Sequence, residues 1–188
     1  MKRLLIYPLT LIAMLACTAQ MSQSTLVLPS SLGYMTEKAD TIVNGIIRDS
    51  YGYWENKVIY TGIHVDVLEY LKSADPARPQ RIELKVMGGR VGDSRLRMDS
   101  APRFKPGEEV LLFLIRHGDR YQVYGFYYGV CRVSTGPDGV SKQVTGPIFS
   151  NREVRNLRTH KVQLNALPPG GEKLADFVQR IRKLIESQ

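Results

Sequence analysis

One cysteine and three histidines are the residues with which the chain could build a nucleophilic site. Cys131 acts as a nucleophile only where a base such as His64, His117 or His160 lowers its pKa. Cys131 shares one face of an alternating segment with Val133, and free cysteines are among the most buried residue types. We therefore interpret Cys131 as a core residue and assign no catalytic residue. A thiol-dependent hydrolase centred on Cys131 is the alternative.

Two histidines are each followed two residues later by an aspartate, as His64 with Asp66 and His117 with Asp119. In a strand, both members of such a pair project to the same face. A metal site needs three or four converging ligands, and no sequence feature joins the two pairs. We therefore predict no metal and no cofactor. The first pair is expected on an exposed strand face and the second in a polar hairpin turn.

Residues 88–107 are the segment best suited to binding. Their glycines and prolines, without helical or strand periodicity, predict a long loop. Its glycines superficially resemble a phosphate loop, but no Lys-Ser/Thr follows them. The loop carries five basic side chains against two acidic ones, which are Arg90, Arg95, Arg97, Arg103 and Lys105 against Asp93 and Asp99. We predict that it contacts the ligand, with Arg90, Arg95, Arg97 and Arg103 as candidate anion-binding residues.

Aromatic residues are concentrated in residues 121–128. Their rings could stack on bases or sugars, which makes an oligonucleotide-binding barrel a further alternative function. We instead interpret about half of them as core residues and the rest as props for neighbouring strands. The five rings are those of Tyr121, Tyr124, Phe126, Tyr127 and Tyr128.

The elements that must position these residues are mostly strands. Ser30 or Ser31 is expected to cap a short helix that carries Leu32, Met35 and Ala39 on one side. A β-branched run over 42–47 predicts the first strand, with a bulge at Gly45. A polar, aromatic loop over 49–57 is expected to follow. Alternation then predicts strands over 59–67 and 82–86, and residues 72–80 form a prolyl connection.

The second half of the chain continues this pattern. An unbroken apolar run predicts a strand over 110–115 that is covered on both faces. Further strands are expected over 121–128, 130–133 and 140–144. Seven residues should form a shared, solvent-inaccessible core: Ile59, Ile63, Val65, Ile82, Leu84, Leu112 and Leu114.

Two helices are expected near the end of the chain. Ser150 and Glu153 have capping-box spacing ahead of Val154 and Leu157, which predicts a short helix. A linker over 165–171 then leads to an apolar stripe from Leu174 to Ile185, which predicts an amphipathic helix that packs on the barrel.

The predicted fold class is mainly β, a small OB-like β-barrel with a short N-terminal helix and a C-terminal amphipathic helix. The order of elements resembles the netrin-like modules of tissue inhibitors of metalloproteases, and uncharacterised exported bacterial domains. Three phrases carry the resemblance, at residues 39–47, 65–72 and 106–114. The inhibitors' disulfides have no counterpart here, so the resemblance implies the fold and not the inhibitory activity.

The first residues have the layout of a secretory signal. Lys2 and Arg3 precede an apolar run from Leu4 to Ala16, which is too short to span a bilayer. Cleavage ahead of Gln20 fits an ordinary signal peptidase, whereas residues 14–17 resemble a lipobox that would lipidate Cys17. Both readings stay open. The protein is therefore expected to be exported, periplasmic or secreted, or lipid-anchored through Cys17.

Charge and length complete the sequence-based hypothesis. Removing Lys2 and Arg3 leaves 24 basic residues against 18 acidic ones, a net charge of +6 that favours acidic partners. We divide the chain into a signal at 1–19, a tether at 20–28, the barrel at 29–147 and a helical extension at 148–188. The expected function is a cell-envelope binding or interaction module without catalytic activity. Its partner is a protein or an anionic envelope component rather than nucleic acid, and any membrane contact runs through Cys17.

Overall fold

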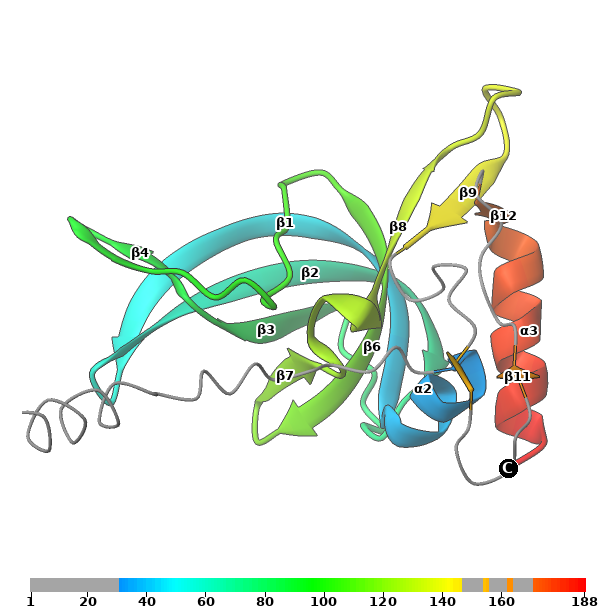
Figure 1. Cartoon of the computed structure of the whole chain (residues 1–188), viewed down its shortest axis with the longest axis horizontal. Coiled ribbons are helices and arrows are strands. Elements are labelled where there is room, and N and C mark those ends of the chain that lie inside the picture. Colours follow the sequence, from blue (N-terminus) through cyan, green and yellow to red (C-terminus); the bar gives the residue numbers. More distant parts are fainter. Residues whose placement is uncertain (1–30, 147–153, 156–161, 164–170) are drawn as a thin grey trace, which may run out of the picture.

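The computed structural model describes residues 31–146, 154–155, 162–163 and 171–188 (Figure 1). Most of the ordered elements are strands, with one helix before the first strand and another at the end of the chain. The mainly β class and both flanking helices are therefore confirmed. The expected signal, Cys17, the tether and Ser150 with Glu153 lie outside the described residues.

Five strands pair in a ring, which makes the sheet barrel-like. The pairings run from β1 to β2, β3, β7, β6 and back to β1. All are antiparallel except the contact between β3 and β7, which is parallel and joins Leu84 to Tyr121. The bounds are β1 Thr41–Glu55, β2 Val58–Lys72, β3 Arg81–Met87, β6 Glu109–His117 and β7 Arg120–Val123.

The sheet continues beyond the ring on the far side of β6. There β8 (Val130–Thr135), β9 (Lys142–Thr145) and β12 (Glu172–Lys173) follow in order. Two short hairpins stand apart, β4 (Gly89–Val91) with β5 (Ser94–Leu96), and β10 (Val154–Arg155) with β11 (Val162–Gln163). The helix predicted over this last region is thus wrong at Val154, which pairs with Gln163 as a strand residue.

The first strand is much longer than predicted. Residues 49–55 were expected in a loop, but they continue β1 and pair with β2 as far as Glu55 and Val58. Asn56 and Lys57, which both have positive φ, form the two-residue connection. The register shifts between Asn44 and Gly45, where the sequence predicts a bulge. The result is a long hairpin that extends away from the ring (Figure 1).

The strand predicted over 121–128 ends early. β7 stops at Val123, and a 3₁₀ helix (η1, Phe126–Gly129) follows. Gly125 and Phe126 have φ values of 70° and 58°, which no strand can include. Local backbone geometry thus overrides the strand preference of the aromatic residues.

The interior of the ring is the predicted core. All seven residues of the predicted core are at most 3% exposed, and six of them belong to the cluster that fills the ring. The seventh, Ile59, is buried farther along β2, where its carbonyl accepts a hydrogen bond from the Gly88 N–H. β6 is covered on both faces, because Leu112 faces the ring interior while Leu111 and Phe113 belong to a second cluster on its other side. Because β6 contributes residues to both clusters, the ring and the helix layer share this strand.

Truncating a side chain of the ring interior tests this core. Leu112→Ala should lower the free energy of unfolding by about 2–5 kcal/mol, because it removes buried methyl groups and leaves a cavity. Leu68→Ala, at a position 53% exposed, is the control and should change it by less than about 0.5 kcal/mol. Urea denaturation followed by circular dichroism measures both. Equal effects would contradict the assigned register.

The second cluster binds the two helices to the sheet. α2 (Leu32–Lys38) begins at Ser31, whose hydroxyl accepts a hydrogen bond from the Tyr34 N–H, as one of the two predicted caps. α3 (Leu174–Glu186) buries Phe177, Val178 and Ile181 against α2 and the sheet. The terminal helix therefore docks as predicted. None of the helices in the described ranges has the length and apolar character needed to cross a bilayer.

Candidate functional site

Cys131 lies in the second core cluster and is fully buried. Burial raises the pKa of its thiol far above the ordinary value, because a thiolate would lose its hydration there. The described residues of this cluster are apolar and include no histidine. The arrangement favours a packing role for the thiol.

The two His-x-Asp pairs lie in different places, and both members of the first pair contact other residues. His64 Nδ1 lies 2.6 Å from Asp49 Oδ1. Asp66 instead contacts Arg81 at 2.7 Å, which lowers the pKa of that carboxyl group. His117 and Asp119 flank the exposed β6–β7 turn. Within the described ranges, no group of three or more potential ligands could hold a metal ion.

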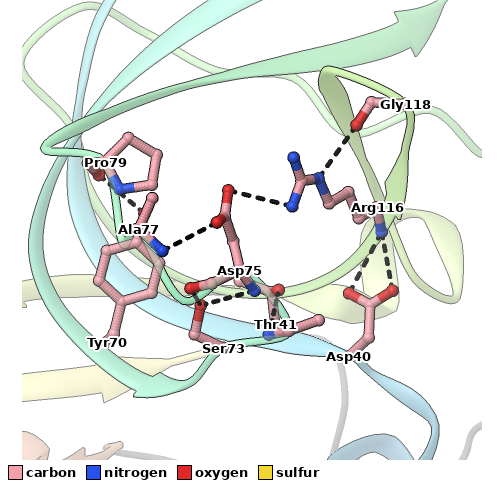
Figure 2. Close-up of polar contacts among 10 residues, drawn as sticks. Asp40, Thr41, Tyr70, Ser73, Asp75, Ala77, Pro79, Arg116 and Gly118 are labelled. Atoms are coloured by element: carbon pink, nitrogen blue, oxygen red, sulfur yellow. Dashed lines mark hydrogen bonds and ion pairs between the residues drawn. The ribbon is translucent and has the colours of Figure 1, made fainter.

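A polar cluster joins the β2–β3 connection to the end of β6 (Figure 2). The carboxylate of Asp75 accepts a hydrogen bond from the Ala77 N–H and forms a 3.0 Å ion pair with Arg116. The same arginine donates from Nε to the Gly118 carbonyl and from its backbone N–H to Asp40. These charges satisfy one another, so the cluster serves to fix a loop.

A row of tyrosines occupies the outer face of the long β1–β2 hairpin. The rings of Tyr51, Tyr53 and Tyr60 follow one another at centroid distances of 5.7 and 6.0 Å. Lys85 Nζ lies 4.3 Å from the Tyr60 ring centre and Arg120 lies 4.9 Å from that of Tyr53. Cations therefore occupy ring faces that a base or sugar would need. We interpret this row as stabilising the hairpin.

The aromatic segment over 121–128 likewise does not form a flat surface. Of the five aromatic residues, of which about half were expected in the core, Tyr121 is 3% exposed and fills the ring interior. Tyr124 and Tyr128 are only partly buried, against the second cluster. Tyr127 and Tyr128 stack on each other at 4.2 Å, in the turn of η1. Tyr124 instead contacts Tyr34 of α2.

Residues 88–107, which we call the arm, fold back over the inner face of the long hairpin. The arm was predicted as a loop without regular structure, but it contains the β4–β5 hairpin. The Thr61 hydroxyl donates to the Gly88 carbonyl, and the Gly88 N–H donates to the Ile59 carbonyl. Figure 1 shows β4 beside the far part of β1. The arm is thus attached to β2 where it leaves β3.

Two glycines allow the arm to approach so closely. A Cβ at Gly52 of β1 would lie 2.0 Å from the Arg90 carbonyl oxygen, and one at Gly89 would lie 2.3 Å from the Thr61 hydroxyl oxygen. Neither distance is tolerated by a real side chain. Gly89 also has a φ of 134°, which only glycine adopts readily.

The arm and the inner sheet face line a half-open cavity of about 510 Å³, which we call the arginine pocket. Its size lies within the range of about 300–1,000 Å³ that is usual for ligand sites. All four arginines singled out from the sequence line it, and no acidic residue is among its described lining residues. These arginines are Arg90, Arg95, Arg97 and Arg103.

The guanidinium groups of the pocket differ in their hydrogen-bond and ion-pair partners. Arg97 pairs with Asp99 at 3.0 Å, but both side chains are well exposed, so the pair contributes little. Arg90 donates from Nε to the Gly92 carbonyl. The side chains of Arg95 and Arg103 have no hydrogen-bond or ion-pair partner among the residues that the structure describes. Two cations are thus available to a ligand.

The walls of the pocket come from strands that sequence reasoning did not connect with the arm. Ser50 of β1, Thr61 and Ile63 of β2, and Val86 of β3 all line it. The available sequence signal for this contact was the pair Gly88 and Gly89, which directly follows a strand and allows a close approach of the backbone.

A smaller cavity of about 200 Å³, which we call the slot, lies next to the arginine pocket. The two cavities share five lining residues, all with apolar side chains: Val86, Met87, Met98, Ala101 and Pro102. The slot adds Phe126, which is 47% exposed, and the partly buried Val123. The other residues that it adds are polar: Tyr60, Lys85, Ser100 and Gln122. The arm segment 98–102 therefore borders both cavities.

No family model matches the chain, and a search of curated proteins finds no significant relative.

Proposed function

We propose that the protein is an exported, non-enzymatic binding module of the cell envelope that holds an anionic component in the arginine pocket. The observation that carries the proposal is the gathering of four arginines around one cavity without an acidic residue among its described lining. The barrel serves as the scaffold and the arm supplies the contacts.

Guanidinium groups suit this role because they bind phosphate and carboxylate through two parallel hydrogen bonds. A charge-assisted hydrogen bond contributes about 1.5–3 kcal/mol. Arg95 and Arg103 have no ion pair within the described structure, so an incoming anion need not displace an internal carboxylate from them. The net charge of +6 that remains without Lys2 and Arg3 also attracts anions to the protein.

The chemistry of the described residues supports binding rather than catalysis. The only titratable side chains in the described lining of the arginine pocket are arginines, which stay protonated and cannot act as a general base. The Thr61 hydroxyl donates its hydrogen to the Gly88 carbonyl. The thiol of Cys131 is buried in a separate cluster. Export is supported by the signal-like start of the sequence.

Charge reversal in the pocket tests the proposal. Calorimetric titration of the purified protein should detect binding of methyl phosphate and of glucuronate, but not of glucose. The double variant Arg95→Glu/Arg103→Glu should bind both anions at least about tenfold more weakly, because two charge-assisted contacts become repulsive. Melting temperatures identify any variant that has lost its fold.

A matched control separates the pocket from the general positive field. Arg78→Glu/Lys183→Glu makes the same change of net charge at exposed positions outside the pocket lining. This variant should retain wild-type affinity. An equal loss in both double variants, or no binding by the wild type, would refute the proposal.

A further inference from the structure

The lining of the arginine pocket combines cationic and apolar side chains. Besides its arginines, its described lining includes Ile63, Val86, Leu96, Met98 and Phe104. Ile63 and Val86 belong to the buried ring interior, and Phe104 packs against that same cluster. The floor of the pocket is therefore the outer limit of the barrel core. A small hydrated anion would leave this apolar floor in contact with water.

The slot extends this apolar lining through Met87, Met98 and Phe126, while Lys85, Ser100 and Gln122 supply polar groups to its walls. Met87 and Met98 border both cavities, and Met87 and Phe126 are among the large apolar side chains that the described structure leaves most exposed, at 43% and 47%. Single exposed apolar residues are common in proteins. Here, however, the two exposed side chains border a slot that adjoins a pocket lined by four arginines.

We infer that the ligand is an amphiphilic anion, with a phosphate or carboxylate head and an unbranched apolar chain. The inference rests on the proposed function of the arginine pocket. The head lies at Arg95 and Arg103, the two guanidinium groups without a described partner. The chain covers the floor at Val86 and Phe104 and passes Met98 into the slot.

A series of alkyl phosphates tests this inference directly. Methyl, butyl, octyl and decyl phosphate are titrated into the purified protein by calorimetry, each below the concentration at which it forms micelles. Affinity should increase about fourfold for each methylene that the apolar floor removes from water, which corresponds to about 0.8 kcal/mol. Alkyl trimethylammonium ions of the same chain lengths should not bind, because the arginines repel their heads.

Two variants separate the head from the chain. Arg95→Glu/Arg103→Glu should weaken every alkyl phosphate by a similar factor and leave the gain per methylene unchanged. Met98→Gln, which keeps the length of the side chain but makes its end polar, should reduce the gain per methylene and leave methyl phosphate unaffected. Leu68→Gln, at an exposed position of β2, is the matched control and should change neither.

The outcomes distinguish this inference from the proposed function. Binding of all alkyl phosphates with equal affinity would overturn the inference that the ligand is amphiphilic, but would leave the proposed anion site intact. Absence of any binding would overturn both. Binding of alkyl trimethylammonium ions as well would show that the apolar surface alone selects the ligand, which contradicts the inference. So would binding to phosphatidate-containing vesicles without binding to monomeric alkyl phosphates, since the chain would then remain in the bilayer.

Discussion

Replacing Phe177 with alanine should lower the free energy of unfolding by about 3–5 kcal/mol. Its ring is fully buried in the cluster shared by α2, α3 and the outer face of β6. Loss of the phenyl ring leaves a cavity between α3 and the sheet, because the packed neighbouring side chains relax only in part. Urea denaturation followed by circular dichroism gives the magnitude.

The exposed side of the same helix supplies the control for Phe177. Gln179→Ala, at an exposed position two residues along α3, should change the free energy of unfolding by less than about 0.5 kcal/mol. Truncation after Pro169 should lower the melting temperature more than Phe177→Ala does. A truncated protein that melts like the wild type would mean that α3 serves a partner or a membrane instead of the fold.

Gly52→Ala should weaken methyl phosphate binding about tenfold while the barrel stays folded. The added Cβ would meet the Arg90 carbonyl oxygen at 2.0 Å, so the arm must move away from β1. Because all four pocket arginines belong to the arm, their arrangement around the anion is lost when the arm moves. A loss of tenfold corresponds to about 1.4 kcal/mol, less than one good charge-assisted hydrogen bond.

Gly33→Ala is the matched glycine control. A Cβ at Gly33 of α2 would make only ordinary contact, with its nearest neighbour at 3.8 Å on Leu184. Alanine also favours the helix by about 1 kcal/mol. This variant should therefore bind as the wild type does and melt at an equal or higher temperature. Unchanged binding by Gly52→Ala would show that the position of the arm does not matter for the site.

The sequence predicts well those strands in which the pattern of apolar and polar residues reflects which side chains are buried. Ile59, Ile63 and Val65 alternate with less buried neighbours such as Tyr60 and His64, and Ile63 and Val65 fill the ring interior. The unbroken run of β6 is apolar because both of its faces are covered. In each case the pattern is visible within one strand.

The far half of β1 was misread because its inner face is covered by backbone rather than by apolar side chains. Ser50 and Gly52 are small since the arm lies against them, so the alternation that identifies a strand is missing there. The candidate site was predicted only in part for a similar reason. The arginines are local to the arm, whereas Thr61 and Val86 join them through a fold-back that no periodicity encodes.

Because Cys131 is buried, alkylation of its thiol can measure how often the core opens. With Cys17 changed to serine, Cys131 is the only cysteine of the chain. It is fully covered by elements that include both helices and three strands, so a maleimide can reach it only after these separate. The rate of alkylation under native conditions therefore reports how often this layer opens. That rate would report on the helix layer, because α2 and α3 contribute residues to the cluster around the thiol.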